Sequence, residues 1–162
     1  MKMMKILKMT PWVLLVGLVL IQLVPVDRSN PPVEGEIVAP PEVAAIFERA
    51  CYDCHSHETV YPWYSRVAPV SWLVVKDIRE GRDELNFSMW TTYTAKRQAH
   101  KMEEIWEKVE EGEMPLWFYL PLHPEARLSE ANLEVFHAWT RDMRPAVPPE
   151  AGAETTPGRL GG

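Results

Sequence analysis

The stretch Cys51-Tyr52-Asp53-Cys54-His55 holds the only two cysteines of this 162-residue chain, and a histidine directly follows the second. This spacing is the signature of covalent c-type haem attachment. Residues three apart on a helical turn share a face, so both thiols can reach neighbouring vinyl groups of one haem. The next residue projects under the ring. The motif therefore predicts Cys51 and Cys54 as tethers and His55 as the proximal iron ligand, with the two middle positions free to vary.

Two other uses of the same residues stay open. Two cysteines this close can form a redox disulfide, although that motif usually sits in a βαβ unit, and the sequence shows none. Alternatively, Cys51, Cys54, His55 and His57 could bind zinc. Structural zinc sites usually draw two ligand pairs from separate segments, so four ligands within seven residues would be cramped.

The N-terminal end has the pattern of a membrane-targeting segment. Lys2, Lys5 and Lys8 precede an uncharged run of 18 residues from Met9 to Val26. That length is at the lower limit for spanning a bilayer. Because the run lacks a small-x-small cleavage site, the sequence favours an uncleaved transmembrane anchor over residues 1–26, with a cleaved signal as the alternative. The lysines would keep that end in the cytoplasm and place the haem domain on the periplasmic or extracellular side of the inner membrane.

Composition divides the rest of the chain into three parts. Residues 27–41 are proline-rich and predict an extended linker, and residues 145–162 predict a disordered tail. Between them, residues 42–144 predict the haem-binding domain. The chain has 23 acidic and 17 basic residues, and three of the basic ones are the N-terminal lysines. Without a basic patch, nucleic acid is excluded as a partner, whereas an acidic surface suits a basic redox partner as well as solubility.

The predicted domain is all-α. Apolar spacing and terminal residues predict helices from near Pro41, from Pro69 to Glu80 with Gly81 as the stop, from Thr94 to Glu111, and from Ser129. The second of these should present an apolar face made of Val70, Leu73, Val74 and Ile78. Phe47, four residues before Cys51, should face the cofactor. The proline- and aromatic-rich residues 59–69 predict an ordered loop around a ligand.

Several short motifs resemble the bacterial haem-binding domain family over residues 51–139. They are Cys-Tyr-Asp-Cys-His-Ser, Tyr-Pro-Trp-Tyr-Ser, Ala-Pro-Val-Ser-Trp, Leu-Asn-Phe-Ser, Gly-Glu-Met-Pro and Leu-His-Pro-Glu-Ala. The resemblance implies a small cytochrome c-like helical domain around one haem. It also implies that the first and last helices of the domain cross, with Phe47 and Trp139 as contacts.

The segment Gly112-Glu113-Met114-Pro115 resembles the sixth-ligand loop of small cytochromes c. This resemblance implies Met114 as the second iron ligand opposite His55. His123 and an open site are the alternatives, and Trp117, Phe118 and Leu120 are candidates for excluding water.

These features lead to one main functional hypothesis and two alternatives. The main one is a membrane-tethered cytochrome with one covalent haem c, an electron carrier rather than an enzyme, which exchanges electrons with redox partner proteins. The first alternative is a haem-based sensor or peroxidase-like enzyme with an open sixth site. The second is a non-haem metal or structural module that uses the same Cys and His residues.

Overall fold

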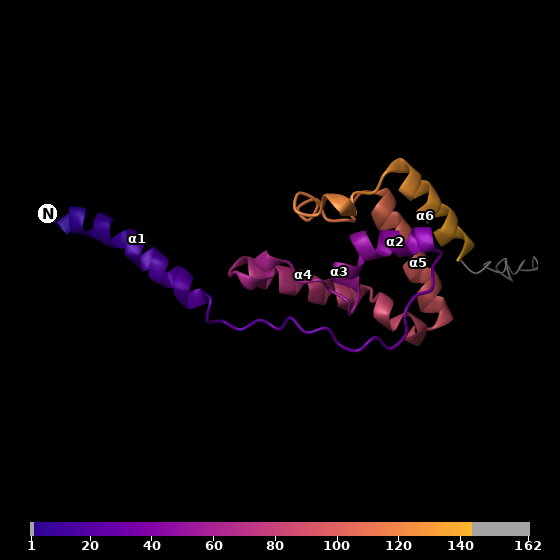
Figure 1. Ribbon diagram of the computed structural model, residues 1–162, viewed down its shortest axis with the longest axis horizontal. Coiled ribbons are helices and arrows are strands. Elements are labelled where there is room, and N and C mark those ends of the chain that lie inside the picture. The colour runs from indigo at the N-terminus through magenta and orange to yellow at the C-terminus, as the bar shows by residue number, and fades with distance from the viewer. Residues whose placement is uncertain (1, 144–162) are drawn as a thin grey trace, which may run out of the picture.

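The computed structural model describes the backbone of residues 2–143 and the side chains of residues 10–143, and all the regular elements in this part of the chain are helices, with no strand among them. Figure 1 shows α1 standing apart from the other helices, which gather around the haem motif. The predicted disordered tail, residues 145–162, lies outside the described residues. The α-helices are α1 (Lys2–Ile21), α2 (Pro41–Ala50), α3 (Tyr52–His55), α4 (Val70–Glu84), α5 (Ala95–Glu110) and α6 (Glu130–Asp142), and three short 3₁₀ helices are η1 (Trp63–Arg66), η2 (Phe87–Thr92) and η3 (Pro124–Ala126).

The predicted fold class was wrong in one part, because no helix of the described residues is both long and apolar enough to span a bilayer. The lysines lie inside α1 rather than before it, and the helix ends at Ile21. Its uncharged portion is therefore the 13 residues from Met9 to Ile21. At 1.5 Å per residue these cover about 20 Å of an apolar layer of about 30 Å. The predicted transmembrane anchor, and the single-pass membrane location that depended on it, are thus overturned.

The segment between α1 and α2 is extended but not a free linker. It runs alongside the haem motif and α4 before it reaches α2 (Figure 1). Asn30 donates a side-chain hydrogen bond to the carbonyl of Thr59 at 3.0 Å, and the amides of Glu34 and Gly35 both donate to the carbonyl of Ser88. These contacts attach the segment to the domain along its length.

Arg82 of α4 joins this segment to the loop that follows the haem motif. Its guanidinium donates to the carbonyls of Ser56 and Ser29, at 2.7 and 3.1 Å, and to the side chains of Asn30 and Thr59, at 2.7 and 2.9 Å. One side chain thereby connects three separate segments of the chain.

The hydrophobic core lies where α2 meets α5 and α6, with Phe47 at its centre. The Phe47 ring is completely buried and lies 4.4 Å from Phe87, 5.6 Å from Phe136 and 5.4 Å from Trp139, between ring centroids. The implied contact between Phe47 and Trp139 is therefore confirmed. Phe47 does not face the cofactor, as its position four residues before Cys51 suggested, because this aromatic cluster encloses it.

Local sequence signals place three of the helix ends correctly. The Thr94 hydroxyl accepts from the amide of Arg97 at the start of α5, and Ser129 forms a reciprocal capping box with Asn132 at the start of α6. Gly112 follows α5 with a φ of 71°, in the left-handed region that favours glycine.

Gly81 does not end α4, which continues through it to Glu84. The glycine is needed for a close approach instead. A Cβ at position 81 would lie 2.7 Å from the carbonyl oxygen of Cys54. The bare backbone of α4 therefore lies directly against the haem motif.

Candidate functional site

The haem motif sits on a short helical turn that continues from α2. The amide of Cys51 donates to the carbonyl of Phe47, and the amides of Cys54 and His55 both donate to the carbonyl of Cys51. This winding places the two thiols and the imidazole on one turn, as the three-residue spacing predicts. The thiols of Cys51 and Cys54 are not joined to each other, which does not support the disulfide alternative. Burial raises the pKa of each thiol to about 12, so both stay protonated.

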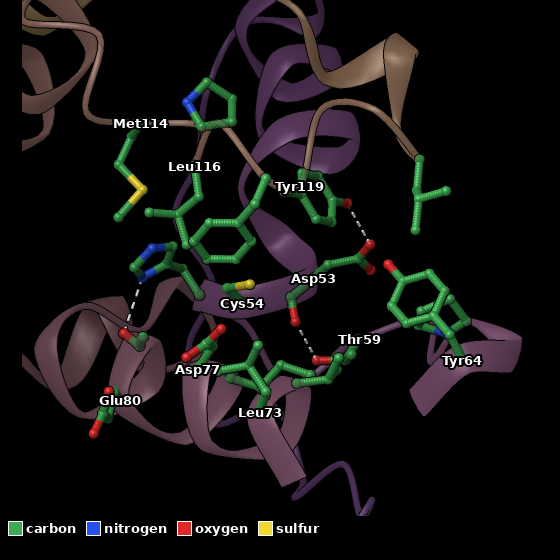
Figure 2. A pocket seen from close by; sticks show the side chains of 18 of the residues that line it. Asp53, Cys54, Thr59, Tyr64, Leu73, Asp77, Glu80, Met114, Leu116 and Tyr119 are labelled. Atoms are coloured by element: carbon green, nitrogen blue, oxygen red, sulfur yellow. Dashed lines mark hydrogen bonds between the residues drawn. The ribbon is translucent and has the colours of Figure 1, made fainter. Parts of the chain in front are cut away.

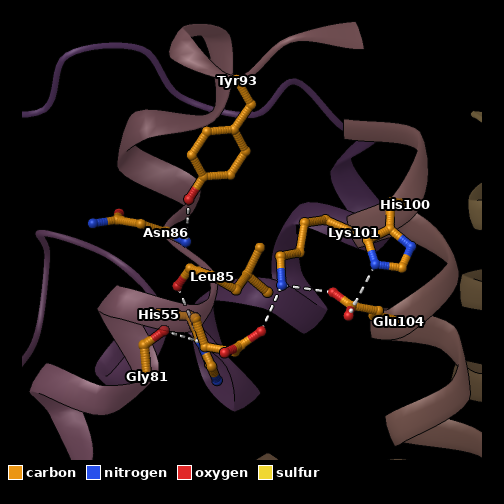
Figure 3. A network of polar contacts seen from close by, with 9 residues as sticks. His55, Gly81, Leu85, Asn86, Tyr93, His100, Lys101 and Glu104 are labelled. Atoms are coloured by element: carbon orange, nitrogen blue, oxygen red, sulfur yellow. Dashed lines mark hydrogen bonds and ion pairs between the residues drawn. The ribbon is translucent and has the colours of Figure 1, made fainter. Parts of the chain in front are cut away.

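His55 is oriented by two backbone carbonyls at the end of α4. Its Nδ1 atom lies 2.9 Å from the carbonyl oxygen of Gly81 and 3.2 Å from that of Leu85 (Figure 3). Because carbonyl oxygens only accept, Nδ1 carries the ring proton and Nε2 has the lone pair that a metal needs. Burial lowers the pKa of the imidazole, so the neutral, ligating form is favoured.

A cavity of about 950 Å³ opens beside His55 and Cys54. One wall comes from α4 through Val70, Leu73 and Val74. Val70 and Leu73 are 44% and 51% exposed, so the apolar face predicted for this helix lines a cavity rather than the core. From the loop after His55, the lining includes Pro62, Trp63 and Tyr64, in the stretch predicted to surround a ligand.

A second cavity of about 280 Å³ lies on the Cys51 side of the motif. Its apolar lining includes Leu85, Phe87 and Ile105. His55 and Met114 line both cavities. The two cavities are therefore neighbours that border the same two residues, and together they are called the slot.

Met114 lies across this slot from α4, on the loop that follows α5. Its amide donates to the carbonyl of Lys108 at 3.0 Å, and Figure 2 shows its thioether directed into the cavity. Leu116 and Phe118 of the same loop line the cavity, but Trp117 and Leu120 do not. Trp117 is 79% exposed, so the structure does not support its predicted role in excluding water.

The alternative ligand His123 is occupied by other partners. Its Nε2 atom lies 2.7 Å from the hydroxyl of Tyr64, and its Nδ1 atom lies 3.2 Å from the carboxylate of Glu125. The ring also stacks on Tyr119 with 3.9 Å between centroids. Both ring nitrogens are thus engaged, and His123 is absent from the lining of either cavity.

The geometry also disfavours zinc. His57 turns away from the motif, with Nδ1 at 2.7 Å from the carbonyl of Pro32 and Nε2 at 2.7 Å from the side-chain amide of Asn86. Within the part of the chain that the structure describes, no three His, Cys, Asp or Glu side chains converge on a possible metal position.

Asp53, one of the two middle residues of the motif, has a structural task that the sequence pattern did not show. Its carboxylate accepts from the amide of Val60 at 3.0 Å and from the hydroxyl of Tyr119 at 2.7 Å. The prediction that both middle positions are free to vary is therefore wrong for this position. Because Tyr119 is 66 residues downstream of Asp53, no local sequence pattern predicts the contact between them.

The donor set fits a haem. An apolar slot suits a flat hydrophobic ring, one imidazole nitrogen is directed by its hydrogen bonds to bind a metal, a thioether faces the same space, and two thiols stand at the motif. Fold and site thus define a small, all-helical haem protein.

The chain belongs to the haem-binding domain family, whose model matches residues 16–142. Searches of curated proteins and of solved structures gave no significant match. Haem binding is accordingly the established property of this domain.

Proposed function

We propose that this protein is a c-type cytochrome that binds one haem covalently and works as an electron carrier rather than an enzyme. The observation that carries the proposal is the placement of Met114 and His55 on the same slot, with a cysteine at each part of it. Cys54 lines the larger cavity and Cys51 the smaller one, so a ring filling the slot meets both thiols.

The bound haem supplies one-electron chemistry, and the residues of this chain determine how it is used. His55 provides a neutral nitrogen held by the carbonyls of Gly81 and Leu85. Met114 provides a thioether, a soft and weak donor that raises the reduction potential. If His55 and Met114 both hold the metal, substrates would not reach it, and the protein would exchange electrons with a redox partner protein.

The lining of the slot supports a carrier more than a peroxidase-like enzyme. No arginine lines either cavity in the described part of the chain, and the only lining histidine there is His55 itself. A second histidine paired with an arginine, as peroxidase-like chemistry would require, is thus lacking from the described lining.

Covalent attachment is tested by mass. Protein produced together with a haem-attachment system should gain the mass of one haem, and this mass should survive denaturation and extraction with acidified acetone. Cys51→Ala with Cys54→Ala should lose it. Haem that extracts freely from the unaltered protein would refute the attachment.

The axial pair is tested by spectroscopy. Oxidised wild-type protein should show the weak sulfur-to-iron band in the far red, and its ferrous form should resist carbon monoxide. Met114→Ala should lose the band, bind carbon monoxide and lower the potential, whereas the matched variant Met143→Ala, at an exposed methionine that lines neither cavity, should retain the wild-type spectrum. If Met114→Ala leaves the spectrum unchanged and His123→Ala alters it, the ligand is His123, and ready binding of carbon monoxide by the wild type would favour a sensor or enzyme with an open site.

A further inference from the structure

The loop that carries Met114 reaches the rest of the domain through very few polar contacts. In the described residues, two hydrogen bonds join residues 115–123 to parts of the chain that are distant in sequence, namely Tyr119 to Asp53 at 2.7 Å and His123 to Tyr64 at 2.7 Å. The backbone hydrogen bonds of this stretch are local, as between the amide of Tyr119 and the carbonyl of Leu116. The position of the loop therefore depends on its side chains.

Asp53 offers the loop a rigid attachment point. One carboxylate oxygen accepts from the amide of Val60 at 3.0 Å, and its backbone carbonyl accepts from the Thr59 hydroxyl at 2.7 Å (Figure 2). The other carboxylate oxygen is left for Tyr119. Because Asp53 lies on the same turn as Cys54 and His55, this attachment point cannot move independently of the haem motif.

The phenol of Tyr119 is well suited to be the donor. It is partly buried and stacks on His123 at 3.9 Å between centroids. Burial, together with the hydrogen bond to Asp53, raises the pKa of the phenol, so it keeps its proton throughout the physiological range. A hydrogen bond from a hydroxyl to a carboxylate is of the stronger, charge-assisted kind.

We propose that Asp53 and Tyr119 are positioning residues that hold Met114 against the haem. This inference rests on the proposed role of Met114 as the sixth ligand. Met114 is fixed on its N-terminal side by the carbonyl of Lys108, and Tyr119 fixes the loop on its C-terminal side. Without the second attachment, the loop moves away from the slot and the thioether loses the geometry that a weak iron ligand requires.

The test uses the full-length, haem-loaded protein and four variants. Tyr119→Phe and Asp53→Ala remove the hydrogen bond. Asp53→Asn keeps it, because an amide can accept from Val60 with its oxygen and donate to the Tyr119 oxygen with its nitrogen. Tyr52→Phe is the matched control, since this neighbouring phenol bonds to Glu36 and not to the loop.

Tyr119→Phe and Asp53→Ala should lose most of the far-red sulfur-to-iron band and bind carbon monoxide in the ferrous form about tenfold more tightly, as expected for the loss of one charge-assisted hydrogen bond. Tyr52→Phe should resemble the wild type, and Asp53→Asn should retain most of the band, because it replaces the charge-assisted hydrogen bond with a weaker neutral one. A merely structural role for the pair would change the unfolding midpoint but leave the band and the carbon monoxide affinity unchanged.

The outcomes also separate this inference from the assignment of Met114. If Met114→Ala alters the spectrum but Tyr119→Phe and Asp53→Ala do not, the positioning role is overturned and the ligand assignment stands. If Met114→Ala leaves the spectrum unchanged, the ligand assignment fails and the positioning role fails with it.

Discussion

The carbonyl oxygen of Gly81 lies 2.9 Å from Nδ1 of His55, and it can do so only because position 81 has no side chain. A Cβ there would approach the carbonyl oxygen of Cys54 to 2.7 Å and its Cβ to 3.3 Å. The last turn of α4 therefore serves two purposes, since it orients the imidazole of His55 and packs closely against the turn that holds Cys51 and Cys54.

Gly81→Ala should destabilise the haem-loaded protein by about 1 to 3 kcal/mol, because the added methyl overpacks a backbone contact that cannot yield. This loss outweighs the gain of up to about 1 kcal/mol that alanine normally brings inside a helix. Denaturant unfolding measures the difference. Gly17→Ala is the control, since nothing lies within 4 Å of its added Cβ and stability should be unchanged or slightly higher. Equal effects of the two substitutions would contradict the role of Gly81.

A chain that begins at Glu34 should be less stable than one that begins at Asp27, because only the longer form keeps the contacts of residues 28–32. These include the bonds of Asn30 to Thr59 and of Arg82 to Ser29 and Asn30, and that of His57 to Pro32. At about 1 kcal/mol for each hydrogen bond, the free energy of unfolding should fall by about 2 to 4 kcal/mol. Urea denaturation of the two haem-loaded forms measures it. Identical midpoints would show that this segment is a spacer after all.

Lys101 should contribute to stability in a pH-dependent way. Its ammonium group is largely buried and lies 2.6 Å from both Glu84 and Glu104 (Figure 3). Burial alone would lower the pKa of Lys101, but the hydrogen bonds that its ammonium group donates to Glu104 and Glu84 outweigh this effect, and the pKa is raised. The hydrogen bond from Lys101 in turn lowers the pKa of Glu84.

The raised pKa of Lys101 stabilises the fold at every pH below the ordinary lysine pKa, and this stabilisation is lost as the pH rises through the raised value. The lowered pKa of Glu84 stabilises the fold at every pH above the ordinary glutamate pKa, and this stabilisation is lost as the pH falls through the lowered value. Lys101→Met should therefore lower the free energy of unfolding most between about pH 5 and pH 10. The loss should be no more than about 1 kcal/mol, because Glu84 is solvent-exposed. Unfolding midpoints across this range provide the measurement. Lys76→Met, which breaks an exposed pair with Glu80, should change stability much less at every pH.

Removal of haem should loosen α4 more than the rest of the domain. Val70 and Leu73 line the slot and are 44% and 51% exposed, whereas Phe47, Met102 and Phe136 are at most 1% exposed in the hydrophobic core. A ligand stabilises most directly the elements that it touches. Amide hydrogen exchange of haem-free protein should be fast in α4 and slow in α5 and α6. Uniformly fast exchange would mean that the whole domain depends on the cofactor.

Local chemistry was predictable from the sequence where neighbouring residues decide the outcome. Thr94 and Ser129 cap their helices through residues three positions away, and the haem motif folds as one turn. The continuation of α4 through Gly81 was not predictable. A glycine can either end a helix or allow a close backbone contact, and only the contact with Cys54 in the folded structure distinguishes the two.

The prediction of a membrane anchor was wrong because the uncharged run from Met9 to Val26 extends past Ile21, where α1 ends. The sequence alone does not mark that helix end. The site residue Asp53 was missed for a different reason. Its partner Tyr119 is 66 residues away, and the two meet only when the loop after α5 folds back over the motif. Contacts of this kind depend on tertiary structure and leave no periodic or spacing signal in the sequence.

The contact of Asp53 with Tyr119 also limits how the turn from Cys51 to His55 can be used in protein engineering. A pentapeptide of the same Cys-x-x-Cys-His pattern from a different protein would supply the same two sulfurs and the same imidazole, but without an acceptor at position 53 it would leave the phenol of Tyr119 without this partner. The five residues of the turn therefore cannot be transferred on their own. A transplant of this haem site into a new scaffold has to carry Asp53 and the Met114–Tyr119 segment together as one unit.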